Sequence, residues 1–267
     1  MRKLGFIGVG NMGGAIIRGI NGKLGNTAVF AYDADPKKIS GLGVFGATAA
    51  TGVSDISEKC DYIVLAVKPQ QLDGVLAEIK AANNKDAVLI SICAGISAEY
   101  IRERTFANAK VVLVMPNTPM MLGEGASAIS KGEGVSDDEF EFAKKIIGSC
   151  GITETIPMDK MKEIIAVNGS SPAFIYLFAK SFVTYAESVG IDKDAALRLI
   201  SQSLVGSAKM MTSGQMTIDE LIKQVSSPGG TTLAGLQELY DGKMLECVIH
   251  ACEACTKRAY ELGEEKK

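Results

Sequence analysis

Residues 4–13 read LGFIGVGNMG, and a helical pattern follows from residue 14. The apolar start predicts a buried strand, and the glycines form GxGxxG between that strand and the helix. Gly8 permits a tight turn, Gly10 lets a pyrophosphate approach the backbone, and Gly13 lets the helix pack close to the strand. A glycine-rich turn without a ligand is the alternative, but the strand-turn-helix context favours a dinucleotide site, whose predicted residues are Gly8, Gly10, Asn11, Met12 and Gly13.

Up to about residue 157 the chain alternates short apolar runs with helical stretches. The runs are rich in Val, Ile and Leu rather than strictly alternating, which is typical of strands buried on both faces. Helical segments between several of them favour right-handed βαβ units and a mostly parallel sheet. An α/β Rossmann domain is therefore predicted over residues 1–157, with strands at residues 3–7, 28–32, 62–67, 87–92, 111–115 and 126–130.

The second half of the chain shows no convincing strand. Pro172 suits the first position of a long helix, and Asp192 suits the cap of the next. Thr217 and Glu220 form a capping-box pattern, and two further helices follow, the last ending at about residue 262. Residues 158–267 are therefore predicted to form an all-helical domain.

Asp33 ends the second predicted strand, 20 residues after Gly13. An acidic side chain at this point of a Rossmann fold binds the adenosine ribose of NAD, and its charge would repel the 2′-phosphate of NADP. Asp33 also begins a good turn sequence, and Lys37 and Lys38 could partly restore phosphate binding. The cofactor is therefore NADH or NADPH, and the charge of Asp33 favours NADH.

Three loops follow the ends of later strands. Ligands of open α/β sheets bind in the crevice at the carboxyl ends of the strands, so these loops should border the site, although prolines and glycines in them also serve loop geometry. The candidate cofactor-binding residues in the loops are Val67, Lys68, Pro69, Ala94, Gly95 and Asn117.

Composition excludes several classes of protein. The net charge is −3, without a block of basic residues, which disfavours a nucleic-acid or anionic-membrane partner. No apolar run approaches the roughly 20 residues of a membrane helix, and a cytoplasmic location is expected. Cys252 and Cys255 form a CxxC inside a helical pattern without a second pair, and His250 is the only histidine, so no metal site is predicted.

Seven stretches in order along the chain resemble the Δ1-pyrroline-5-carboxylate reductase family. They are FIGVGNMGGAI, AVKPQ (66–70), AG (94–95), MPNTP (115–119), NGSSPAF (168–174), GSAKM (206–210) and SSPGGTT (226–232). The resemblance implies a Rossmann domain followed by a helical domain that dimerises, often within a ring of dimers. The family's Ser-Gly-Ser-Gly-Pro reads Asn168-Gly169-Ser170-Ser171-Pro172 here, and its NADPH-preferring members usually carry small or basic residues at the position of Asp33.

The implied activity is the reduction of Δ1-pyrroline-5-carboxylate to L-proline by hydride transfer from NAD(P)H to C5 of the imine. Gly229, Gly230, Thr231 and Thr232 open a predicted helix whose free N–H groups suit a small carboxylate, with Ser170 as a further implied substrate contact. Thr232 is the candidate catalytic residue, since its hydroxyl could bond the ring nitrogen; an ordinary N-cap role is the alternative.

Two other functions remain open from the residues. A β-hydroxyacid dehydrogenase has the same two-domain plan and uses a catalytic lysine, for which Lys180 or Lys209 is available. A non-catalytic dinucleotide sensor is the second alternative, because fold alone does not fix function. The SSPGGTT stretch has no evident place in the first mechanism and argues against the second.

Overall fold

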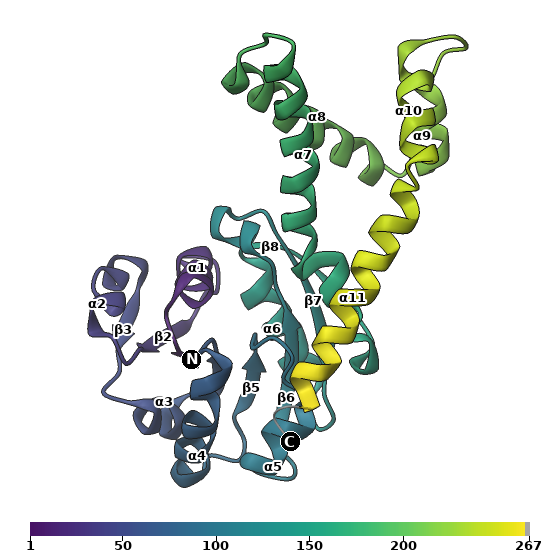
Figure 1. Ribbon diagram of the computed structural model, residues 1–267. Helices are drawn as coiled ribbons and strands as arrows, with labels where there is room; N and C mark the ends of the chain where they lie inside the picture. The colour runs from purple at the N-terminus through teal and green to yellow at the C-terminus, as the bar shows by residue number, and fades with distance from the viewer. Residues whose placement is uncertain (265–267) are drawn as a thin grey trace. The chain divides into compact units, whose positions relative to one another are not determined.

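The computed structural model describes residues 1–264. Within them, eight strands form one sheet in the order β3-β2-β1-β4-β5-β6-β7-β8, and only β6 and β7 pair antiparallel (Figure 1). The strands are β1 (Arg2–Ile7), β2 (Thr27–Tyr32), β3 (Ala47–Ala49), β4 (Tyr62–Leu65), β5 (Val88–Ser91), β6 (Lys110–Met115), β7 (Gly125–Lys131) and β8 (Gly151–Thr155).

Helices cover both faces of this sheet. They are α1 (Asn11–Ile20), α2 (Pro36–Ile39), α3 (Val53–Lys59), α4 (Leu72–Ala82), α5 (Ala98–Arg104) and α6 (Asp137–Gly148). Phe6 and Val64 join the core beneath α1 and α6, whereas the adjacent residues Ile7 and Leu65 join the core beneath α3, α4 and α5. Successive strand residues point to opposite faces, so a strand apolar at every position stabilises both layers.

The sheet changes direction of winding at β1. This strand pairs with β2 on one side and with β4 on the other, and all three run parallel. Their carboxyl ends therefore meet at one edge of the sheet, together with the end of β5. A crevice at such a switch point is the usual ligand site of this architecture.

The remaining helices are α7 (Ser171–Ser188), α8 (Lys193–Thr212), α9 (Ile218–Gln224), α10 (Thr231–Asp241) and α11 (Met244–Glu264). The caps are those predicted: the carboxylate of Asp192 accepts a hydrogen bond from the N–H of Ala195 at 2.9 Å, and Thr217 and Glu220 form a capping box. The predicted fold class is confirmed, with a mostly parallel sheet first and helices after it.

Two strands escaped prediction. β3 is three residues long and contains only Ala and Thr, so it lacks an apolar run. β8 reads GITET and lies at an edge of the sheet, with two of its five residues half-buried and three exposed. Short or polar edge strands carry little sequence signal because they need only one covered face.

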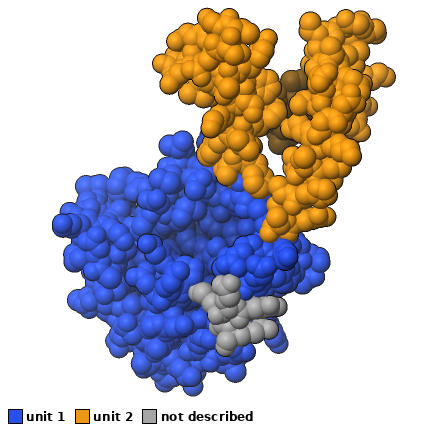
Figure 2. Space-filling model, in the orientation of Figure 1, with its two compact units in different colours: residues 1–170, 255–267 blue, residues 171–254 orange. Residues whose placement is uncertain are grey.

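The chain divides into two compact units, which Figure 2 shows in different colours. The first comprises Met1–Ser170 together with the chain from Cys255 onward, and the second comprises Ser171–Ala254. The end of α11 belongs to the sheet unit, where the hydroxyl of Tyr260 donates to the carboxylate of Glu163 at 2.8 Å. These units differ from the two domains predicted from the sequence, residues 1–157 and 158–267. The assignment of cofactor binding to the first domain and of substrate binding and dimerisation to the second stays a prediction.

The second unit buries few of its apolar side chains. Helices α7 and α8 pack together, yet Leu177 is 66% exposed and Leu199 is 70% exposed. Large apolar side chains of α7 and α8 that are also exposed include Ile175, Tyr176, Phe182, Tyr185 and Leu197. Among residues 1–264, no helix combines the length and apolar character needed to cross a bilayer. Apolar surface of this extent on a helical unit is typical of a protein–protein interface.

We therefore expect the chain to be a dimer or a larger homo-oligomer in solution. Burial against a second copy would remove the apolar faces of α7 and α8 from water, which favours association. Static light scattering across a concentration series measures the mass. A monomer that is fully active at every concentration would contradict this expectation.

Candidate functional site

The glycine loop joins β1 to α1 and brings the two elements very close together. Gly8 has a positive φ of +93°, which a residue with a side chain rarely adopts, and a Cβ there would lie 2.5 Å from the carbonyl oxygen of Ala66. A Cβ on Gly13 would lie 2.3 Å from the carbonyl oxygen of Gly8. Both positions therefore require glycine for the fold itself.

Gly10 differs from these two glycines. A Cβ built on it would meet no atom within 4 Å, so the fold does not need a glycine there. Gly10 is also the N-cap of α1, and it has no side chain to cover the first N–H groups of the helix. Free N–H groups at a helix N-terminus bind anions. The open space beside Gly10 therefore suits the pyrophosphate of a dinucleotide.

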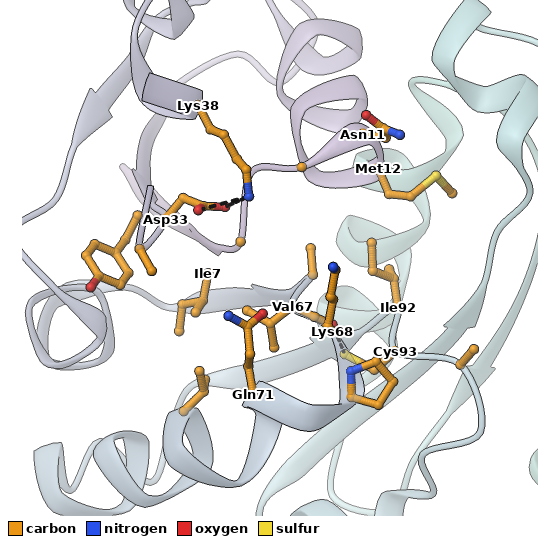
Figure 3. Close-up of a pocket in the computed structure, with 18 residues that line it drawn as sticks. Ile7, Asn11, Met12, Asp33, Lys38, Val67, Lys68, Gln71, Ile92 and Cys93 are labelled. Atoms are coloured by element: carbon orange, nitrogen blue, oxygen red, sulfur yellow. Dashed lines mark hydrogen bonds and ion pairs between the residues drawn. The ribbon is translucent and has the colours of Figure 1, made fainter. Parts of the chain in front are cut away.

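The carboxylate of Asp33 is tied to this loop. Its Oδ2 accepts a hydrogen bond from the N–H of Val9 at 2.9 Å, and its Oδ1 accepts one from the N–H of Asp35 at 2.9 Å. The ammonium of Lys38 lies 3.2 Å from Oδ1 and 3.4 Å from Oδ2 (Figure 3). Four contacts match the roughly four acceptor sites of a carboxylate.

These contacts also fix the charge of Asp33. Burial raises the pKa of this carboxyl, but the N–H groups of Asp35 and Val9 and the ammonium of Lys38 outweigh burial, and the pKa lies below its usual value of 3.8. The ionised carboxylate therefore stabilises the folded loop at neutral pH, and this contribution is lost only as the pH falls below about 4.

A cavity of about 410 Å³ opens at the carboxyl ends of β1, β2, β4 and β5 (Figure 3). The structure brings most of the predicted cofactor residues together in its wall. Those residues are Gly8, Gly10, Asn11, Met12, Asp33, Val67, Lys68, Pro69 and Ala94. Their role in binding a dinucleotide stays a prediction, but their convergence on one cavity supports it.

Three predicted residues lie elsewhere. Gly13 packs against Gly8 instead of facing the cavity. Gly95 lines a second cavity of about 390 Å³, which also borders Cys93. Asn117 is 9% exposed and lines neither cavity; its Oδ1 accepts a hydrogen bond from the N–H of Ala126 at 2.9 Å.

Cys93 and Gln71 also line the first cavity, and neither is among the residues that the sequence predicts to bind the cofactor. The thiol of Cys93 donates towards the carbonyl oxygens of Leu65 and Val67, each 3.4 Å away, and so ties the end of β4 to the end of β5. The position of Cys93 directly before Ala94 was the available signal. Gln71 directly follows the KPQ motif, and this position is a comparable signal in the sequence.

The candidate substrate segment lies in the second unit, at the start of α10. Gly229 has a positive φ of +72°, and Gly230 is the N-cap in extended backbone without a side-chain cap. The N–H of Gly230 donates to the carbonyl of Ser227 at 3.0 Å. Thr231 and Thr232 are both exposed on the first turn. Ser170 belongs to the first unit, where its N–H donates to the carbonyl of Ile165 at 2.8 Å.

No group of three or more His, Cys, Asp or Glu side chains within residues 1–264 is arranged to hold a metal ion. Cys252 and Cys255 are half-buried thiols on α11. The two lysines considered for a dehydrogenase are both exposed: Lys180 lies on α7 and Lys209 lies on α8.

Comparison with known proteins identifies relatives along the whole chain. Residues 158–262 match the family model described as pyrroline-5-carboxylate reductase dimerisation, and residues 3–95 match the model described as NADP oxidoreductase, coenzyme F420-dependent. The pyrroline-5-carboxylate reductase of Escherichia coli is 30% identical, covering 98% of this chain and 99% of its own. That of Pisum sativum is 31% identical, covering 97% of this chain and 96% of its own.

The chain belongs to the pyrroline-5-carboxylate reductase family. The predicted family and the predicted class of enzyme, an NAD(P)-dependent oxidoreductase, are thereby confirmed. A pyrroline carboxylate reductase from Plasmodium falciparum, solved with NADP bound, has a TM-score of 0.87 at 30% identity over 98% of both chains. The reductase from Coxiella burnetii has a TM-score of 0.91 at 29% identity over 97% of both chains.

The two loop glycines Gly10 and Gly13 should respond differently to alanine. Gly10→Ala adds a methyl group in open space, so the free energy of unfolding should change little while the Kd for the dinucleotide rises at least about tenfold, or 1.4 kcal/mol. Gly13→Ala should also lower the free energy of unfolding, because its Cβ meets the carbonyl of Gly8. Denaturant unfolding and titration of NADH fluorescence measure the two quantities. Equal dinucleotide affinity in Gly10→Ala and the wild type would exclude the loop as the pyrophosphate site.

Proposed function

We propose that this reductase converts Δ1-pyrroline-5-carboxylate to L-proline, the last step of proline synthesis, with a nicotinamide dinucleotide bound in the cavity at the glycine loop. The observation that carries this function is the similarity to pyrroline-5-carboxylate reductases over the full length of the chain. The space beside Gly10 supports the cofactor, since the chain leaves open the place where a pyrophosphate would meet the start of α1.

The reaction needs few groups from the protein. When bound, the dinucleotide supplies a hydride from C4 of its nicotinamide ring to C5 of the imine, and the π electrons of the C=N bond move to nitrogen. The substrate can bind as the protonated imine, which already makes C5 electrophilic. The remaining task of the chain is to hold the two reactants in register in a dry crevice.

We assign the substrate carboxylate to the start of α10. Gly229 and Gly230 have no side chains that would block a carboxylate from the backbone. The first N–H groups of the 11-residue helix α10 point out of its N-terminus. Hydrogen bonding and the helix dipole both favour an anion there. The hydroxyl of Thr232 then orients and hydrogen-bonds the ring nitrogen, and Ser170 is a second proposed substrate contact.

A homodimer is the smallest assembly that we propose, and a ring of dimers is the larger form implied by the family. The match of residues 158–262 to a dimerisation model supports a homo-oligomer. The exposed apolar side chains of α7 and α8 lie within that range. Location in the cytoplasm stays a prediction from the sequence.

The cofactor preference depends on Asp33 and Lys38. We propose that NADH is preferred, because an ionised carboxylate at Asp33 faces the position of the ribose and repels a 2′-phosphate. The ion pair with Lys38 weakens this repulsion. The preference for NADH should therefore be moderate.

Oxidation of NADH and of NADPH in the presence of pyrroline-5-carboxylate tests both the function and the preference. The wild-type chain should oxidise both NADH and NADPH with this substrate. It should reduce neither NAD⁺ nor NADP⁺ with a panel of β-hydroxy acids. Asp33→Ser should raise the ratio of kcat/KM for NADPH over NADH, and the control Lys38→Met should lower it. A ratio in Asp33→Ser within about twofold of wild type, under roughly 0.5 kcal/mol, would show that Asp33 does not set the preference. Turnover of hydroxy acids instead of the imine would support the dehydrogenase alternative.

Thr232→Ala should lower kcat/KM for pyrroline-5-carboxylate by about tenfold to a hundredfold, or 1.4–2.7 kcal/mol, as expected for one hydrogen bond to a charged group. Thr231→Ala, on the same helical turn, is the matched control. Dinucleotide affinity should stay the same in both variants. Gly230→Val is a poorer test of the segment, because a Cβ on Gly230 would lie 2.6 Å from Oγ of Ser227 and disturb the turn itself. Normal kinetics in Thr232→Ala would remove this residue from the site.

A further inference from the structure

The antiparallel ladder between β6 and β7 stops where the MPNTP motif begins. Its last pair is Met115 with Ala128. The next residue, Pro116, has no N–H to donate and cannot continue the ladder. In the same register Asn117 lies opposite Ala126, so the backbone groups of Ala126 that face β6 need other partners.

Two asparagine side chains provide those partners. The Oδ1 of Asn117 accepts from the N–H of Ala126 at 2.9 Å. The Nδ2 of Asn168 donates to the carbonyl oxygen of Ala126 at 3.1 Å and to that of Met115 at 2.7 Å. Asn168 thus uses both of its amide hydrogens to join the end of β6 to β7, on either side of the MPNTP loop.

A π-helical turn places Asn168 in this position. The segment Ile165–Gly169 is π-helical, and the N–H of Ser170 donates to the carbonyl of Ile165 at 2.8 Å. π-Helical turns are rare and are frequently found at functional sites. Gly169 lies close to the sheet, since its Cβ would be 3.4 Å from Sδ of Met115. Asn168 therefore connects two sequence motifs, MPNTP and NGSSPAF, that lie about fifty residues apart.

We propose that Asn168 is a positioning residue for hydride transfer: by binding the carbonyls of Met115 and Ala126, it holds the MPNTP loop at the carboxyl end of β6. Met115 lines the second cavity, which shares Cys93 with the cavity at the glycine loop, so this loop borders the space next to the proposed cofactor site. This proposal rests on the proposed function. Asn168 acts through the loop and makes no contact with the reactants. Small errors of position in a site of this kind lower the rate of the chemical step more than they lower binding.

The chain contains a matched control for the hydrogen bonds themselves. The Nδ2 of Asn84 also donates to two carbonyl oxygens, those of Ser57 at 2.9 Å and Cys60 at 3.1 Å. Both asparagines are half-buried. Asn84, however, precedes β5 and bonds the segment that precedes β4, at the amino ends of these strands and away from the cavity. Asn84→Ala removes two hydrogen bonds of the same kind and leaves the MPNTP loop unchanged.

The experiment compares Asn168→Ala with Asn84→Ala in the intact chain. Thermal unfolding should show a similar decrease in Tm for both. Asn168→Ala should lower kcat at least about tenfold and raise the primary isotope effect on kcat with 4-deuterated NADH, because hydride transfer becomes rate-limiting. The Kd for NADH, measured by fluorescence, should change less than about threefold, since the pyrophosphate contacts are intact. Asn84→Ala should keep the wild-type kcat and isotope effect.

Asn168→Ser supplies a second variant in case Asn168→Ala does not fold. Serine can donate to only one of the two carbonyls, so kcat should lie below the wild-type value and the isotope effect above it. Wild-type kinetics in an Asn168 variant that has lost stability would overturn the proposal and leave Asn168 with a structural role only. A wild-type chain that fails to reduce pyrroline-5-carboxylate would overturn the proposed function as well, so the two failures are distinguishable.

Discussion

Helix α1 begins so close to β1 that a methyl group on Gly13 would lie 2.3 Å from the carbonyl oxygen of Gly8. This close approach directs the free N–H groups of α1 towards the carboxyl edge of the sheet, at the point where β1 separates β2 from β4. It also brings the N–H of Val9 within reach of Asp33, at the end of β2. The proposed pyrophosphate site and the proposed ribose site would therefore both depend on one packing contact between a helix and a strand.

Beyond that contact, side chains complete the edge of the sheet where ladder hydrogen bonds end. Asp33 accepts from Val9, Cys93 donates towards Leu65 and Val67, and the amides of Asn117 and Asn168 satisfy Ala126. Buried backbone polar groups must find partners, and at a strand end the partner is often a polar side chain. Asp33 and Cys93 lie just after strand ends and also line the first cavity, so at these two positions backbone satisfaction and the shape of the proposed cofactor site depend on the same residues.

The elements with strong local patterns could be predicted from the sequence. The glycine loop, the buried strands and the caps at Asp192 and Thr217 depend on residues a few positions apart. The edge strands β3 and β8 could not, because their residues are small or polar. In the sequence, Asn168 is distinguished only as a departure from a family pattern, since its partners lie 42 and 53 residues away and no local pattern encodes such a contact. For the same reason the sequence placed Gly95 and Asn117 at the first cavity, although the structure places neither in its wall.

Asp33 has a structural role and a proposed role in cofactor choice, and one substitution cannot separate them. Its carboxylate stabilises the glycine loop through Val9 and supplies the charge that we propose discriminates between the two cofactors. Any neutral residue at this position changes both the charge and the hydrogen bond to the glycine loop. Lys38 is 48% exposed and touches Asp33 only through its ammonium group, so it can change the charge with little effect on the loop. If the charge at this position sets the cofactor preference, substitution of Lys38 would change that preference with less effect on the fold than substitution of Asp33, because Lys38 makes no hydrogen bond to the glycine loop.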